Sequence, residues 1–171
     1  VIRQYGGVSA LPAYRQKQLL QELQAIEPSV SAISAEFLHF VDSDKLSAVD
    51  DKNLGALLTY DTPYTDKNAG ELFLVVPRPG TISPWSSKAT DIAHNAGLAS
   101  VKRIERGTAY YIASRKPLPR AKVGKLLYDR MTEAVLDSTK SAEALFVVAQ
   151  PKPLKDVDVL TGGKTALLEA N

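Results

Sequence analysis

A polar, proline-rich loop directly follows one of the most apolar runs of the chain. The run is Leu72–Val76, and residues 77–91 (PRPGTISPWSSKATD) come immediately after it. A short apolar run bounded by glycine and proline predicts a buried strand. Pro77, Pro79 and Gly80 then predict a stiff, exposed loop. Because a helix is expected to begin next, the loop can present donors to an anion or to a partner surface.

Seven residues of this loop are candidates for contact with a substrate or another domain: Arg78, Thr81, Ser83, Trp85, Ser86, Ser87 and Lys88. In a functional interpretation, the cations and hydroxyls face an active site or a ligand phosphate, and the single tryptophan packs on a neighbouring domain. In a structural interpretation, Ser83 or Ser87 caps the helix, Trp85 fills a gap in the core, and the charges are solvated. The residues alone leave both interpretations open.

The elements around the loop occur in an order that is repeated in the chain. The second half predicts a strand, a helix, two strands meeting at Arg106-Gly107-Thr108, a helix and a last strand, at 71–76, 86–96, 101–112, 123–135 and 145–149. The first half repeats this order less clearly, at 1–5, 9–26, 30–42 and 46–58. We therefore expect an α+β fold of duplicated βαββαβ units, with antiparallel or mixed sheets and helices on the outer face. This domain is expected over residues 1–150, and residues 151–171 are expected to be the first part of a linker.

Several segments also resemble the N-terminal region of large-type phosphoribosylformylglycinamidine synthase, the formylglycinamide ribonucleotide amidotransferase. The most specific is PRPGTISPWSSKATDIAHN at 77–95. Four more agree in the same order: SALPAYRQKQLLQEL (9–23), AEFLHFVD (35–42), VKRIERGTAYYI (101–112) and LYDRMTEAVL (127–136). The resemblance spans nearly the whole chain. It implies a domain similar to a fused pair of the small subunit of the multi-subunit enzyme.

The resemblance implies a part in purine biosynthesis. The full-length ligase would convert formylglycinamide ribonucleotide, ATP and glutamine to formylglycinamidine ribonucleotide, ADP, phosphate and glutamate. A glutaminase domain would release ammonia, and a synthetase domain would use ATP and magnesium. The partners of this chain would then be those two domains of the same polypeptide. Its role would be to support their assembly and the transfer of ammonia through a channel.

The residues themselves predict no catalytic or metal-binding group in this chain. It has no cysteine, so a thiolate nucleophile is excluded. Gly163-Lys164-Thr165 lacks the earlier glycine of a phosphate loop, because Asp158 stands at that position. His39 and His94 are single and are expected to be structural. We therefore expect the chain alone to be inactive and to bind no cofactor.

Composition limits the remaining classes of partner. The chain has 21 basic and 19 acidic residues, too balanced to favour nucleic acid or an acidic membrane. No apolar run has the length of a membrane span, and the first residues are unlike a signal peptide. A cytoplasmic protein is expected. The alternative to an enzyme domain is a stand-alone αβ adaptor or oligomerisation module without catalysis.

Overall fold

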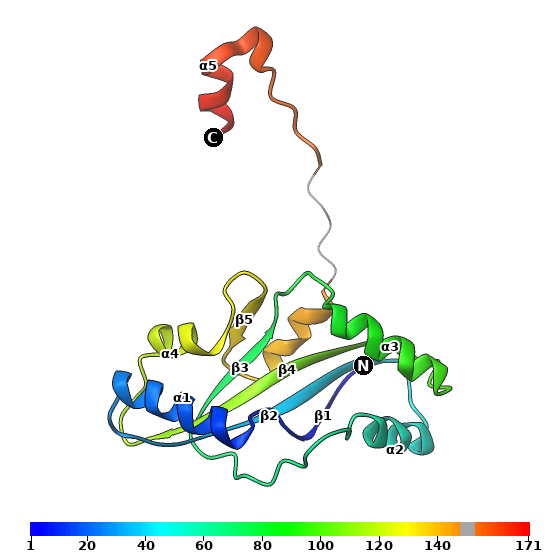
Figure 1. Cartoon of the computed structure of the whole chain (residues 1–171). Helices are drawn as coiled ribbons and strands as arrows, with labels where there is room; N and C mark the ends of the chain where they lie inside the picture. The colour runs from blue at the N-terminus through cyan, green and yellow to red at the C-terminus, as the bar shows by residue number, and fades with distance from the viewer. Residues whose placement is uncertain (148–152) are drawn as a thin grey trace.

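Two long strands, β2 (Val30–Ser43) and β4 (Val101–Ser114), form the centre of an antiparallel sheet. The computed structural model describes residues 1–147 and 153–171. Within them the sheet has five strands in the order β1-β2-β4-β3-β5 (Figure 1). The other three strands are β1 (Ile2–Ser9), β3 (Glu71–Pro77) and β5 (Glu133–Leu136). The expected α+β class with an antiparallel sheet is confirmed.

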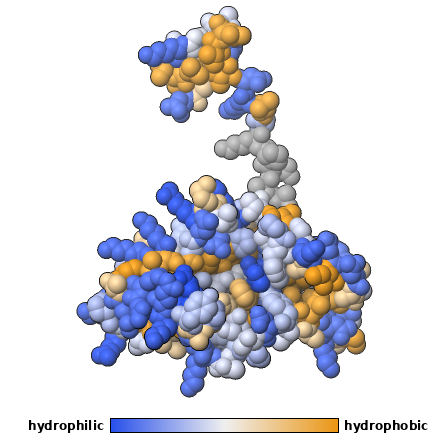
Figure 2. Space-filling view, viewed as in Figure 1, coloured by the Kyte–Doolittle hydropathy of each residue, from blue (hydrophilic) through white to orange (hydrophobic). Residues whose placement is uncertain are grey.

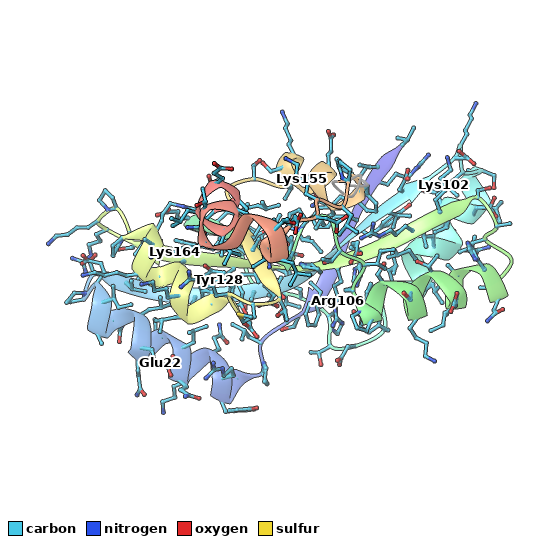
Figure 3. The ribbon with its side chains drawn as sticks, turned by 90° about the horizontal axis from the view of Figure 1, so that it is seen from above. Glu22, Lys102, Arg106, Tyr128, Lys155 and Lys164 are labelled. Carbon is cyan, nitrogen blue, oxygen red and sulfur yellow. The ribbon has the colours of Figure 1, made fainter. Side chains whose placement is uncertain are left out.

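Four helices cover one face of the sheet. Helices α1 (Ala13–Ile26) and α4 (Arg120–Leu127) share one apolar core with the sheet, and α2 (Ala48–Leu57) and α3 (Pro84–Asn95) share another. Side chains alternate between the faces of a strand. In β2, Ile33 and Val41 therefore face the helices, whereas Leu38 and Phe40 face the other way. There they pack with the 3-10 helix η1 (Lys140–Phe146), which lies across the sheet from α1 and α4 (Figure 3).

The predicted duplication is present, but each repeat has one long strand where a pair was expected. The order β1-α1-β2-α2 recurs as β3-α3-β4-α4. Phe37 and Thr108 stand at matching positions of β2 and β4 and face each other in the register. After α4, β5 pairs with the outer edge of β3, and after α2, Pro63 forms a single bridge to Val8 of β1. The repeat is therefore βαβα, the second copy adds the strand β5, and the two copies share a single sheet.

Gly107 explains the wrong prediction of a turn at 106–108. It lies in the middle of β4, where β3 approaches closely. A Cβ atom built at this position would lie 3.0 Å from both the carbonyl oxygen of Val75 and Cγ1 of Val76. The glycine thus makes room for a neighbouring strand, and close approach of another backbone is a known reason for glycine inside a strand.

Other elements near the C-terminus also differ from expectation. The helix expected over 123–135 ends at Leu127, and residues 133–136 form β5. Leu145 and Phe146 of the last expected strand belong to η1, while its residues 148–149 lie outside the described residues. The expected boundary at 150–151 lies there as well. The expected linker contains a helix, α5 (Val159–Ala170), which Figure 1 shows away from the sheet.

The strand and helix on either side of the candidate loop are confirmed. β3 ends at Pro77 and α3 begins at Pro84, with Ser83 as its N-cap residue. At the other end, Gly97 has φ +85°. Its N–H donates to the carbonyl of His94, and the N–H of Leu98 donates to that of Ala93. This is the Schellman arrangement that a glycine after a helix permits.

We predict that Gly107→Ala lowers the free energy of unfolding by about 1–3 kcal/mol, because the added methyl group would push β3 away from β4. Urea denaturation of the 171-residue chain would measure this loss. Gly124→Ala in α4 is the matched control, since its Cβ would meet its nearest atoms at 3.9 Å. That change should stabilise the helix by about 0.5–1 kcal/mol. Equal effects at both positions would contradict the close approach of β3 and β4.

Candidate functional site

An arginine held between two aromatic rings lies at the middle of the helix-covered face. The Cζ atom of Arg106 is 4.2 Å from the ring centre of Phe37 and 4.6 Å from that of Trp85. Its Nη1 donates a hydrogen bond of 3.0 Å to the hydroxyl of Tyr60. Figure 3 shows Arg106 in the interval between the ribbons of α1 and α3. The guanidinium is thus in cation–π contact with two aromatic rings.

The same hydroxyl connects Arg106 to a buried histidine. Tyr60 Oη lies 3.0 Å from Nε2 of His39, whose side chain is fully buried. Because an arginine can only donate, the Tyr60 hydroxyl accepts from Arg106 and forms a second hydrogen bond with His39. Burial, and then the charge of Arg106, lower the pKa of His39 to about 4, so the ring is neutral at pH 7.

A buried carboxylate fixes the candidate loop to β4. Glu105 has no exposed surface and accepts hydrogen bonds of 3.0 Å from Ser83 Oγ and from Nε of Arg103. Arg103 also donates to the carbonyl of Thr81 at 2.7 Å. Ser83 Oγ in turn accepts from the N–H of Ser86, which makes Ser83 the helix cap. The loop is therefore held at two points before α3 begins.

The seven predicted site residues do not converge on one point. The side chain of Arg78 is exposed and lines a cleft of about 880 Å³ together with Arg120 and Arg130. Lys88 instead lines an apolar hollow of about 350 Å³. These two cations therefore belong to different depressions of the surface.

Two of the four candidate hydroxyls of the loop, those of Thr81 and Ser83, serve the local structure. Thr81 Oγ1 donates to the carbonyl of Arg78 at 2.7 Å. Ser86 Oγ is buried and has no hydrogen-bond partner within residues 1–147 and 153–171. Ser87 is exposed in the first turn of α3. The structural interpretation of Ser83 as a helix cap is confirmed, whereas contact of the loop with a substrate or another domain stays a prediction.

Trp85 separates the two depressions that matter most. On one side it stacks on Arg106 in a groove of about 150 Å³, which also includes Thr108 and Glu133. On the other side it lines the apolar hollow between α2 and α3, with Leu57, Leu58, Tyr60, Lys88, Ala89 and Ile92. Figure 2 shows apolar surface at the end of the domain where these helices lie. Trp85 is thus half-buried and structural, with an exposed part available to a partner.

A family model described as "Formylglycinamide ribonucleotide amidotransferase N-terminal" matches residues 36–146. The chain belongs to this family. The match extends from β2 to η1. It includes the candidate loop, Arg106 with its two aromatic contacts Phe37 and Trp85, and the apolar hollow between α2 and α3. Membership gives the chain a part in an enzyme of purine biosynthesis, as the resemblance of the loop segment implied.

Sequence reasoning missed the central residues of this amidotransferase domain. Phe37, His39 and Arg106 come to one face only because β2 and β4 pair along their whole length. The spacing of Phe37 and His39 indicates that they share one face of a strand. The predicted turn at 106–108, however, would place Arg106 outside any strand. His39 was expected to be structural, and the structure buries it.

The described residues also limit other kinds of site. No helix in the ranges 1–147 and 153–171 combines the length and apolar character needed to cross a bilayer. Across those ranges, no group of three or more His, Cys, Asp or Glu side chains is placed to hold a metal ion.

The depressed pKa of His39 predicts a loss of stability on mild acidification. Between its unfolded pKa of 6.5 and its folded value of about 4, the unfolded chain binds a proton that the folded domain resists. Stability should therefore be retained above pH 6.5 and fall by up to about 3 kcal/mol as the pH drops to 4.

Urea titrations from pH 7 to 4.5 would measure this effect. The difference between the parent and His39→Gln should shrink steadily on acidification, because glutamine does not titrate. His39→Asn is the control, because it also removes the titrating ring and should give the same pH dependence as His39→Gln. Parallel stability curves for the parent and His39→Gln would contradict the assignment.

Proposed function

We propose that this domain positions the synthetase and glutaminase domains of its own polypeptide and supports ammonia transfer between them. The reaction would be the conversion of formylglycinamide ribonucleotide, ATP and glutamine to formylglycinamidine ribonucleotide, ADP, phosphate and glutamate. The observation that carries the proposal is the family match across the loop and both of its flanking elements. A match to the N-terminal part of an enzyme favours this role over a stand-alone adaptor.

The physical task assigned to the domain is rigidity at a domain boundary. The loop at 77–83 is held by Glu105 and by the cap of α3, so its backbone has little freedom. A preformed surface loses little conformational entropy on docking. Keeping two active sites in fixed relation also helps to exclude water from the path between them. Loss of the Glu105 contacts or of the α3 cap should therefore reduce the coupling of glutamine hydrolysis to product formation more than it reduces the rate of either reaction.

The proposal assigns the chemistry to the other domains. A glutaminase of the resembled type uses a cysteine nucleophile, and this chain has none. ATP and magnesium would bind to the synthetase domain, so this domain would need no cofactor of its own. We place the enzyme in the cytoplasm and the domain boundary near residue 150, with α5 in the linker.

We expect the 171-residue chain to fold but to catalyse no step of the reaction. Neither ATP hydrolysis nor formylglycinamidine ribonucleotide should form above background with glutamine or ammonium as the nitrogen source. The control is the full-length enzyme assayed under the same conditions. ATP turnover by the chain that depends on formylglycinamide ribonucleotide would overturn the assignment of chemistry to the other domains.

A polar substitution in the hollow tests the positioning role in the full-length enzyme. Ile92 lines the hollow and is 48% exposed, so Ile92→Thr should change the stability of the chain by less than about 0.5 kcal/mol. If the hollow faces another domain, the variant should hydrolyse more glutamine per product formed. We expect the ratio to rise at least about twofold.

Val49→Thr is the matched control, since Val49 is also an exposed β-branched residue on a helix but lies outside the hollow. It should leave the ratio at the parent value. Equal ratios for parent, Ile92→Thr and Val49→Thr would exclude the hollow as a docking surface.

A further inference from the structure

Arg106 has donors that the domain does not use. A guanidinium carries five N–H groups in one plane. The side chain of Arg106 makes one hydrogen bond within the described residues, from Nη1 to Tyr60. The guanidinium lies over the rings of both Phe37 and Trp85, so the edge of its plane is the part that offers free N–H groups to a ligand. That edge lies at the groove of about 150 Å³ lined also by Ser83, Thr108 and Glu133.

Three other arginines, two in the sheet and one at the start of α4, differ from Arg106 in having a carboxylate partner. Arg3 pairs with Asp51, Arg103 with Glu105, and Arg120 with Glu71 and Asp137. Among the described residues, no carboxylate lies within 4.0 Å of the Arg106 guanidinium. Glu133 lines the same groove, but its Oε2 accepts from the main-chain N–H of Asp129 at 2.8 Å.

We propose that Arg106 is a docking point for a carboxylate side chain from another domain of the full-length enzyme. This inference rests on the proposed positioning function. The planar edge of a guanidinium matches the two oxygens of a carboxylate, and the pair forms two parallel hydrogen bonds. The aromatic clamp already restricts the arginine, so binding costs little side-chain entropy.

The groove favours a carboxylate over a phosphate group. Among the described residues, Arg106 is the only cation lining it, and Glu133 places a carboxylate in the same wall. Either anion would meet the Glu133 carboxylate, which repels a phosphate dianion with two charges more strongly than a carboxylate with one. The hydroxyls of Ser83 and Thr108 can contribute further hydrogen bonds.

The indole N–H of Trp85 reports on this site, because it is the single tryptophan of the chain and its ring stacks on Arg106. We would titrate the 171-residue chain with sodium acetate at constant ionic strength and follow this NMR resonance. A saturable shift is expected with acetate but not with chloride. Arg106→Lys should weaken acetate binding by about tenfold or more, because an ammonium group cannot be clamped or bind both oxygens.

The matched control is Arg115→Lys, at an exposed arginine outside the groove, which should leave the titration unchanged. The inference is overturned if chloride gives the same shift as acetate, or if Arg106→Lys keeps the parent affinity. It is also overturned if inorganic phosphate binds more tightly than acetate, since the site would then be a phosphate site.

The full-length enzyme provides the second arm. Arg106→Lys should raise the glutamine hydrolysed per product formed, as Ile92→Thr should. If Ile92→Thr uncouples the enzyme but Arg106→Lys does not, the positioning role stands and the carboxylate partner is excluded. If neither variant changes coupling, the positioning role fails at both surfaces and Arg106 has no interdomain carboxylate partner.

Discussion

The pairing of β2 with β4 is the constraint on which the rest of the domain depends. Each strand has 14 residues, and the register runs from Val30 opposite Ser114 to Ser43 opposite Val101. This length gives the sheet two ends, and each end carries its own pair of helices. The midpoint, at Phe37 and Thr108, lies between these helix pairs. A groove across the middle of the helix-covered face follows directly from the geometry.

Two buried carboxylates on the η1 face of the sheet are satisfied in different ways. Next to the loop, Glu105 is neutralised by Arg103 and hydrogen bonded by Ser83. Glu36 forms no ion pair within the described residues. It accepts instead from the N–H of Gly7, the amide of Asn68 and the hydroxyl of Tyr111. Burial, and then Glu36, raise the pKa of Tyr111, so its hydroxyl remains a donor. Breaking either arrangement would leave a buried charge unsatisfied, which is costly.

The rigid candidate loop lies beside two open depressions of the surface. Glu105 and the α3 cap hold the loop, and Trp85 then stands between a clamped arginine and an apolar hollow. At the other end of the sheet, α1 and α4 pack together over a continuous core. The duplicated fold therefore has one closed helix pair and one pair with an apolar hollow. That asymmetry within one chain places the proposed contacts of this amidotransferase domain at the end with α2 and α3.

Local patterns in the sequence determined the strand at 71–76, the helix after the loop, its serine cap and its terminal glycine. Each of these depends on residues close together in the chain, where proline, glycine and hydroxyl side chains act directly on the backbone. The duplicated α+β class also followed from the order of such elements. The predicted turn at Gly107 is wrong, however. The reason for this glycine is the approach of β3, which is about 30 residues away in the sequence.

The tertiary structure alone decided the site. Arg106, Phe37, Trp85, Tyr60 and His39 come from four regions of the chain, and nothing in their local spacing joins them. Likewise, Arg78 and Lys88 are ten residues apart in one loop segment but line different depressions. The sequence by itself determined the family and the stiff loop, because both depend on local residue types. Which side chains meet was decided by strand register, because only long-range pairing brings distant residues to one face.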